Sequence, residues 1–200
     1  MILEGVLLDL VPYDADFLKH EREWHNGPMR VWWGLDGLLS EAGIQQRREF
    51  FASLPSAGQV RFGMRAKDGN PIGMFVLANI DYYNRTAEVG AGIGDPDYWS
   101  GGFGSDAMLL IVDYGFRQLD LRRLWLTTAG TNFRAQRQIE KCGFTREGAR
   151  RLELLAVEGP GYQDFLWYGL LREDWPGRDA MVEQLGLQEK ARQRGYEDGT

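Results

Sequence analysis

The stretch from Tyr98 to Ala107 has the residue types of an anion-binding loop that opens a helix. Gly101, Gly102 and Gly104 lie within it, and an apolar segment, Met108 to Phe116, follows directly. The first N–H groups of such a helix have no partner within it, and the helix dipole adds positive potential at the same end. Glycines also let phosphates approach the main chain, because no Cβ intervenes. The loop therefore predicts a phosphate-bearing cofactor held by backbone amides.

Two other phosphate-binding motifs do not fit this loop. The glycines lie in the middle of the chain, and no clear strand–helix–strand unit with a ribose-binding acid follows them, which argues against a dinucleotide-binding fold. A P-loop requires Gly-Lys-Ser or Gly-Lys-Thr, which the sequence lacks. The nature of the cofactor must therefore come from the other motifs of the chain.

A second chemical feature is the segment from Thr86 to Gly94, which we expect to be a strand. Because side chains alternate along a strand, Glu88 shares one face with Gly90, Gly92 and Gly94. Glycine in a strand marks a bulge, or a place where a ligand or another backbone approaches closely. Glu88 is then either a general base beside a ligand or a solvated charge on an edge strand, and both interpretations stay open.

Aromatic and imidazole side chains offer further candidates. Trp32 and Trp33, together with Trp24, could form the wall of a pocket for a cation, although packing in the core explains them equally well. His20 and His25 are the only two histidines, and their spacing does not place them on one helical face. A metal site is therefore not expected.

Composition narrows the class of protein. A net charge of -6 and a pI of about 5.0 argue against a nucleic-acid binder and favour cationic small molecules or basic peptides as partners. No apolar run approaches the ~20 residues that span a bilayer, and the N-terminus has no signal-peptide pattern. The single cysteine, Cys142, excludes an internal disulfide and is expected to be a buried small residue rather than a nucleophile. These features predict a cytoplasmic location with no membrane partner.

The order of expected elements indicates an α+β fold, because runs of strands are separated from the helices. Strands are expected over residues 3–11, 60–67, 71–81, 86–94, 123–128, 144–157 and 162–171, the last with Tyr162 and Tyr168 as sheet residues, and helices over 14–24, 40–54, 104–119 and 132–142. Residues 1–176 are expected to form one domain. The tail, residues 177–200, follows the Pro176-Gly177 break; it could be helical, and we expect it to be dispensable for the cofactor site.

Two motifs together carry a family resemblance. The loop from Tyr98 to Ala107 resembles the acetyl-CoA pyrophosphate loop of the GNAT N-acetyltransferases, and Asn132 to Phe144, an Asn-led helix that ends in Glu-Lys-Cys-Gly-Phe, resembles their next cofactor motif. The segment from Tyr162 to Trp175 is similar to the RimJ/RimL branch, which is named for acetylation of ribosomal-protein N-termini. The resemblance covers about Leu3 to Trp175.

The resemblance implies a mixed, mainly antiparallel central sheet with flanking helices and two splayed central strands. Acetyl-CoA would enter the gap between these strands. Ile93 would offer main-chain bonds to the pantetheine arm, and Asn132 would bond it from the other side. Glu88 would lie beside the thioester. The pyrophosphate would lie on the amides of Gly101, Gly102, Phe103, Gly104 and Ser105.

Two residues depart from the family pattern. Trp99 stands where the family usually has a basic residue, so phosphate binding would depend on amides or on arginines elsewhere. Ile139 stands where many members have a tyrosine that acts as general acid. The catalytic acid is therefore not identified by the resemblance.

The sequence as a whole predicts an acetyl-CoA-dependent N-acetyltransferase in which a primary amine attacks the thioester directly, with Glu88 as its base. The acceptor is expected to be a peptide or protein N-terminus, a polyamine or an aminoglycoside-like amine, with Trp32 and Trp33 as its candidate binding residues. Because of Ile139, a non-catalytic acyl-CoA-binding module stays open as the alternative. No nucleic acid or metal is expected as a partner, and a homodimer is left open.

Overall fold

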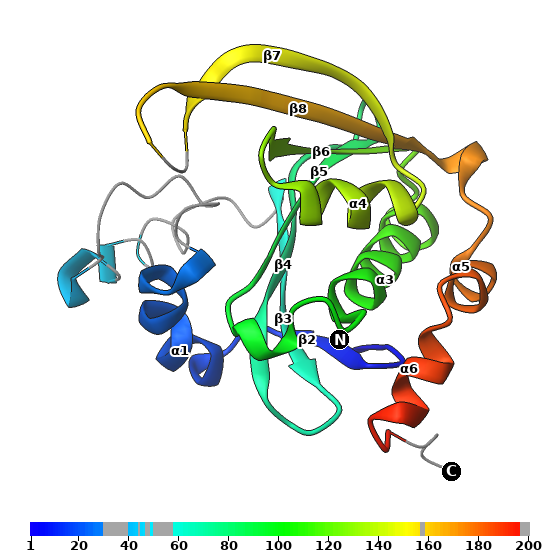
Figure 1. The fold of residues 1–200 in the computed structure, drawn as a ribbon. Helices are drawn as coiled ribbons and strands as arrows, with labels where there is room; N and C mark the ends of the chain where they lie inside the picture. Colours follow the sequence, from blue (N-terminus) through cyan, green and yellow to red (C-terminus); the bar gives the residue numbers. More distant parts are fainter. Residues whose placement is uncertain (30–39, 44, 47–48, 50–57, 157–158, 197–200) are drawn as a thin grey trace.

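The structure, a computed structural model, describes residues 1–29, 40–43, 45–46, 49, 58–156 and 159–196 (Figure 1). Trp32 and Trp33, and much of the helix expected over residues 40–54, lie outside the described residues. The described part is organised around one open sheet. Helix α1 (Ala15–Asn26) covers one face of this sheet, and α3 (Phe103–Arg117) and α4 (Phe133–Lys141) cover the other.

The sheet has eight strands among the described residues, in the order β1-β2-β3-β4-β5-β6-β8-β7. Every neighbouring pair is antiparallel except β5 and β6, which are parallel. The predicted α+β, mainly antiparallel architecture is therefore confirmed. The strands are β1 (Leu3–Glu4), β2 (Leu8–Pro12), β3 (Val60–Ala66), β4 (Pro71–Asp81), β5 (Thr86–Ile93), β6 (Arg123–Ala129), β7 (Thr145–Leu155) and β8 (Tyr162–Leu171).

The two central strands separate after a short paired stretch. β5 and β6 pair only through Thr86 with Arg123, Ala87 with Leu124 and Glu88 with Trp125. Beyond Glu88, β5 stays paired with β4 and β6 stays paired with β8, so each strand follows its own half of the sheet. The expected splay of the central strands is confirmed, and Glu88 lies where it begins.

The N-terminal strand differs from the prediction. Residues 3–11 were expected to form one strand, but β1 and β2 are two strands that pair with each other around a turn. The Asp106 side chain from α3 accepts hydrogen bonds from the turn amides of Val6 and Leu7 at 2.8 and 2.6 Å. The turn therefore depends on a residue about 100 positions away, which the local pattern of apolar residues does not reveal.

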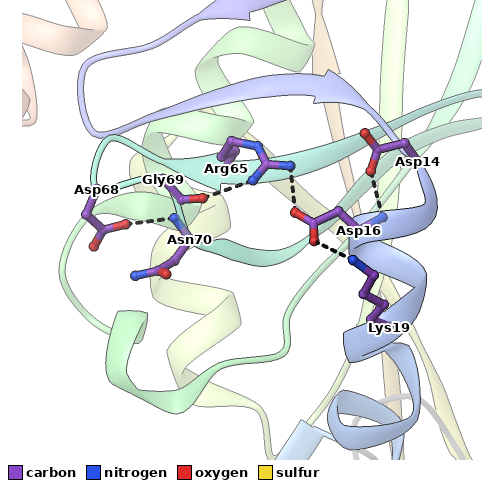
Figure 2. Close-up of polar contacts among 7 residues, drawn as sticks. All are labelled: Asp14, Asp16, Lys19, Arg65, Asp68, Gly69 and Asn70. Carbon is purple, nitrogen blue, oxygen red and sulfur yellow. Dashed lines mark hydrogen bonds and ion pairs between the residues drawn. The ribbon is translucent and has the colours of Figure 1, made fainter.

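Helix α1 begins at a side-chain cap and is attached to the sheet by charge. The Asp14 side chain accepts from the Asp16 N–H at 3.0 Å, which satisfies one of the free amides of the first turn. Arg65 of β3 donates to the Asp16 carboxylate at 3.0 Å and to the Gly69 carbonyl oxygen at 2.9 Å (Figure 2). These contacts connect α1 to the turn between β3 and β4.

Helix α3 is the centre of the core. It is buried on nearly every side, as its apolar sequence predicts, and single-turn η3 (Pro96–Tyr98) leads into the loop before it. After η4 (Arg172–Asp174), the chain forms α5 (Arg178–Gln184) and α6 (Leu187–Gln193), and α5 contacts α3. No helix in the described part of the chain is long and apolar enough to cross a membrane.

Candidate active site

A cleft of about 1580 Å³ opens where β5 and β6 separate. Its walls come from β5 and β6, from the N-terminal ends of α3 and α4, and from parts of α1 and α6. Gly102, Gly104, Ser105, Asn132 and Glu88 all line it, so the splay brings residues from distant parts of the sequence together. Most of the residues singled out from the sequence therefore meet in one place.

The glycine loop forms the amide-rich end of the cleft. Gly102 is the N-cap of α3 and has a φ of 97°, a left-handed conformation that favours glycine. The Asp106 N–H donates to the Gly102 carbonyl at 2.9 Å, which closes the first turn of the helix. The amides ahead of Asp106 have no carbonyl within the helix to bind. They are available to an anion at the end of the cleft.

Phe103 and Gly104 of the loop offer a ligand only their main chain, because one side chain is buried and the other residue has none. Phe103 is fully buried and packs edge-on against Tyr98 at 5.0 Å between ring centres. A Cβ on Gly104 would lie 2.7 Å from the Gln138 side-chain oxygen. Gly104 was expected to make room for a phosphate, but the closest group in the structure is this glutamine of α4. The glycine allows α3 and α4 to pack closely beside the cleft.

Asn132 and Ile93 are both partly engaged with the protein itself. The Asn132 Oδ1 accepts from the Ala135 N–H at 3.2 Å and caps α4, so its Nδ2 is the group left to donate toward the cleft. The Ile93 carbonyl accepts from the Trp99 indole N–H at 2.8 Å. A pantetheine amide at Ile93 would therefore share this carbonyl oxygen with Trp99, or accept a hydrogen bond from a main-chain N–H instead.

Trp99 positions a positive charge instead of supplying one. The Arg134 guanidinium of α4 lies 3.8 Å from the centre of the Trp99 ring, which is a cation–π contact. Arg134 also lines the cleft, with Arg137 and Lys141 of the same helix. The side of the cleft formed by α4 is therefore cationic, although the usual basic residue of the family is absent.

Glu88 lies at the opposite end of the open region from the helix N-terminus. Its Oε2 accepts from the Asn79 Nδ2 at 2.7 Å. Asn79 has a φ of 48°, and the β4–β5 register shifts between Ala78 and Asp81. A bulge of this kind changes the direction of the neighbouring side chains and is common beside active sites. The Asn79 amide thus fixes the Glu88 carboxylate at the point where the strands part.

The glycine face of β5 is explained in part by α1. A Cβ on Gly94 would collide with the Trp24 ring of α1. Trp24 is therefore a packing residue of this face, whereas Trp32 and Trp33 lie outside the described residues. The close approach predicted from the glycines is real, but at Gly94 it is made by a side chain of the protein.

Sequence reasoning missed a buried glutamate–histidine pair on α1. Glu21 and His25 are each 3% exposed and line the cleft, with His25 Nε2 3.7 Å from the Glu21 Oε1. Their i, i+4 spacing, which puts two side chains on one helical face, could have found them. The described residues contain no group of three or more His, Cys, Asp or Glu side chains that could hold a metal ion.

Cys142 and the two tyrosines lie away from the chemistry. Burial raises the pKa of the Cys142 thiol to about 12, so this side chain is protonated and packed in the core. Tyr168 is buried in β8, where its hydroxyl donates to the Glu140 carboxylate at 3.2 Å. Tyr162 is exposed. Ile139, which stands where the resemblance implies a tyrosine, lines the cleft.

Comparison with known sequences gives acetyltransferases. The chain is 34% identical over 110 residues to YdaF of Bacillus subtilis, whose name is putative ribosomal N-acetyltransferase, and the match covers 55% of this chain and 58% of that protein. It is also 34% identical over 104 residues to a spermidine N(1)-acetyltransferase of Vibrio cholerae, covering 52% of this chain and 58% of that one. The chain thus matches less than two thirds of the length of these relatives.

Solved structures agree on the fold. A spermidine N-acetyltransferase of Vibrio cholerae, in complex with CoA and spermine, superposes with a TM-score of 0.74 at 24% identity and covers 84% of this chain and 97% of that one. RimJ of Mycobacterium smegmatis, in complex with CoA-disulfide, gives a TM-score of 0.76 at 18% identity and covers 93% of each chain. At these identities the likeness concerns the fold.

The family to which the chain belongs is identified by a match that covers more of the chain. The family model of the acetyltransferase (GNAT) domain matches residues 6–145, a range that includes β5, the glycine loop and the Asn132-led helix. The splayed strands and the amide-rich end of the cleft lie within this range. The chain belongs to the GNAT acetyltransferase family.

Proposed function

We propose that this chain transfers the acetyl group of acetyl-CoA to a primary amine. The observation that carries the proposal is the cleft between β5 and β6, which has free helix amides at one end and the Glu88 carboxylate at the other. A thioester cofactor with a phosphate-bearing end matches both chemical features. Membership of the GNAT family and the CoA complexes of similar folds support this assignment.

The cofactor would lie along the splay. Its pyrophosphate would accept from the amides of Gly101 to Ser105, and the cationic side chains of α4 would add to their attraction. The pantetheine arm would run between the two strands, beside Ile93 and the Asn132 Nδ2. The thioester would then reach the region of Glu88. In this placement the glycine-loop end of the cleft binds the pyrophosphate, and the Glu88 end holds the reacting thioester.

In the proposed reaction the neutral amine attacks the thioester carbonyl, a C–N bond forms and the C–S bond breaks, and the proton that the nitrogen then loses goes to the departing CoA sulfur, directly or through solvent. An amine with a pKa near ~10 is mostly protonated at neutral pH, so its proton must leave first. Glu88 would accept this proton directly or through a water. Main-chain N–H groups along the open edge of β5 would stabilise the oxyanion, and the cleft would align the two reactants.

The acceptor is proposed to be cationic. Glu21, Glu88 and Glu153 all line the cleft, and an ammonium group would be attracted to this carboxylate-bearing surface. The similar proteins include a spermidine acetyltransferase and one named for ribosomal acetylation, so polyamines and protein N-termini of the RimJ/RimL type are the first acceptors to test. An aminoglycoside-like amine is a third class of acceptor, and the homodimer that the sequence leaves open is tested together with the activity.

The deciding experiment measures thiol release from acetyl-CoA across N-terminal peptides, polyamines and aminoglycosides. Turnover with an amine supports the proposal. Tight CoA binding without turnover on any amine of the panel would instead identify a non-catalytic acyl-CoA-binding module. The specific activity at different protein concentrations, compared with the oligomeric state from sedimentation, shows whether a dimer is the active species.

Glu88→Gln tests the base. The amide keeps the size of the side chain and can still accept from Asn79, but it cannot take a proton. We expect kcat to fall by about 10²-fold at neutral pH with little change in acetyl-CoA affinity. The remaining activity should rise more steeply with pH, because the solvent must then supply free amine.

A matched control is Glu153→Gln, which removes another carboxylate from the cleft wall. If both variants lower the affinity for the amine and neither lowers kcat, the carboxylates act only by attraction. Near-wild-type kcat for Glu88→Gln at neutral pH would show that deprotonation does not depend on Glu88.

A further inference from the structure

The C-terminal helices reach the cofactor end of the cleft. Gln184, Leu185 and Lys190 line the cleft, although the tail was expected to be dispensable for it. Four apolar side chains hold the tail on the body of the protein, and each is at most 8% exposed: Met181, Val182, Leu187 and Ala191. The tail is therefore packed beside the glycine loop, and its being dispensable for cofactor binding stays a prediction.

Two cations of the tail lie directly against the glycines of the loop. A Cβ on Gly101 would be 2.5 Å from the Arg194 Nη2, and a Cβ on Gly102 would be 3.1 Å from the Lys190 Cδ. The absence of side chains at these positions is what lets both cations approach the loop. Lys190 lines the cleft, and Arg194 lies against Gly101 of the same loop, so both positive charges lie beside the amides that begin α3.

Each cation is held in place by a contact that leaves its charge available. The Arg194 guanidinium lies 4.7 Å from the centre of the Phe103 ring, and Lys190 Nζ donates to the Leu185 carbonyl at 2.9 Å. An ammonium group has three donors, so Lys190 keeps two for a ligand. A guanidinium group over an aromatic ring keeps its N–H groups, which point outward in the guanidinium's own plane, free to donate.

Neither charge is neutralised by a carboxylate of the described residues. The acidic residue of the same helix, Glu189, is occupied by Arg192 at 2.8 Å and by Gln193 at 3.1 Å. In a chain with a net charge of -6, two cations with no carboxylate partner in the described part of the chain, beside open helix amides, are a marked local excess of positive charge. Such an excess attracts anions into the cleft.

The tail is also attached to the start of the loop. The Tyr196 hydroxyl donates to the Asp68 carboxylate at 3.1 Å, and the Tyr98 hydroxyl donates to the same oxygen at 2.7 Å. Asp68 lies in the turn between β3 and β4 (Figure 2). One carboxylate therefore connects the end of the tail with the residue that opens the glycine loop, which keeps α6 in register with the amides.

We propose that Lys190 and Arg194 bind the diphosphate of the cofactor, so that α6 completes the cofactor site and adds to the positive charge that Arg134 brings to the Trp99 side of the loop. This inference rests on the proposed function, because it requires a CoA-type ligand in the cleft. The loop amides and the two cations would hold the diphosphate from two sides. The cationic residues of α4 that line the cleft would add to the attraction for the phosphates of CoA, its third phosphate included.

The test is calorimetry of CoA and of 3′-dephospho-CoA, which lacks that third phosphate, with a Lys190→Met/Arg194→Met double variant. Methionine keeps the apolar stem of each side chain and removes the charge. The variant should bind both ligands at least about tenfold more weakly, since a charged contact is worth about that much. In turnover, the KM for acetyl-CoA should rise by the same factor, while the KM for the amine stays unchanged.

Arg192→Met is the matched control, because it removes a cation of the same helix that is paired with Glu189. It should bind CoA within twofold of wild type. Equal binding by wild type and the double variant, or a loss for CoA alone, would overturn the inference. Failure of the wild-type chain to bind CoA would overturn the proposed function instead. Unchanged circular dichroism and thermal unfolding confirm that the double variant keeps its fold.

Discussion

Asp106 offers the sharpest test of how the fold holds the cofactor loop. Its carboxylate is fully buried in the first turn of α3. One oxygen accepts from the amides of Val6, Leu7 and Leu8 at 2.8, 2.6 and 3.3 Å, and the other has no partner among the described residues. The side chain therefore connects the β1–β2 turn to the helix whose N-terminus faces the cleft.

Two physical effects at Asp106 oppose each other. Burial raises the pKa of the carboxyl, which means that the charged form is costly in the folded state, while the backbone amides and the charge of Arg178 act in the other direction. Removing the acceptor leaves the Leu7 and Leu8 N–H groups buried without partners. At about 1–3 kcal/mol for each, the loss would be about 2–6 kcal/mol.

Comparison of two substitutions separates these effects. Asp106→Ala removes the acceptor, whereas Asp106→Asn keeps a carbonyl oxygen and removes only the charge. We expect Asp106→Ala to lower the free energy of unfolding by at least about 2 kcal/mol more than Asp106→Asn does. Urea unfolding followed by tryptophan fluorescence and circular dichroism measures this difference. Equal losses for the two variants would refute the view that hydrogen bonding to the turn is the main role of Asp106.

The pH dependence has a definite sign. A carboxyl with a raised folded-state pKa binds its proton more tightly in the folded than in the unfolded chain. Above the folded-state pKa, the buried charge lowers the free energy of unfolding by its full amount. This destabilisation disappears as the pH falls toward the unfolded-state pKa of about 3.9. Wild type should gain stability relative to Asp106→Asn across this window. A constant difference between the two proteins would contradict the pKa direction.

Two further predictions concern side chains outside the cleft. Cys142 is fully buried with its thiol pKa raised to about 12, so an aromatic disulfide at pH 8 should leave the folded protein unmodified and label one thiol per chain after unfolding; rapid labelling of the folded protein would contradict this burial. The hydrogen bonds from Arg123 lower the pKa of Glu147, so the pair stabilises the protein above the unfolded pKa of glutamate and loses this effect as pH falls through the folded pKa. Glu147→Gln should therefore cost at most about 1 kcal/mol at pH 7 and nothing in acid, as unfolding at the two pH values would show.

Elements controlled by local residues could be predicted from the sequence. Asn132 caps α4 through its own side chain, and Gly143 follows the helix with a φ of 94°, as the Asn and Gly positions indicated. The glycine loop begins α3 for the same kind of reason. These features depend on residues within one turn of each other, so the sequence pattern carries nearly all of the information.

Features that depend on distant residues could not be predicted in the same way. The turn between β1 and β2 depends on Asp106, and the close approach at Gly94 comes from Trp24. The sequence allowed a helical tail but gave no sign of where it packs; Leu187 and Ala191 are buried because α6 meets the surface of the loop. Alternation along β5 placed Glu88 on a face, but the Asn79 bulge that fixes its carboxylate is a property of the neighbouring strand.

The exchange of a basic residue for Trp99 illustrates how a site can keep its charge while losing the expected residue. The indole binds the Ile93 carbonyl and supports Arg134 on its face, so the positive charge comes from the next helix. The sequence at position 99 shows only that a cation is missing. The packing of α4 against the loop shows that the Arg134 side chain brings a positive charge to the same place.

The same reasoning applies to Ile139, which occupies the place of a catalytic tyrosine and leaves the cleft without that phenol. In the proposed reaction the leaving group is a thiol, and the reference pKa of a thiol is about 8.5, well below the value of about 10.4 for a primary alkylamine. A thiolate can therefore depart near neutral pH with little help from an acid, whereas the attacking amine must lose a proton before it can react. The larger demand on the protein falls on the base, and the base that we propose is Glu88, which Asn79 holds where the strands part.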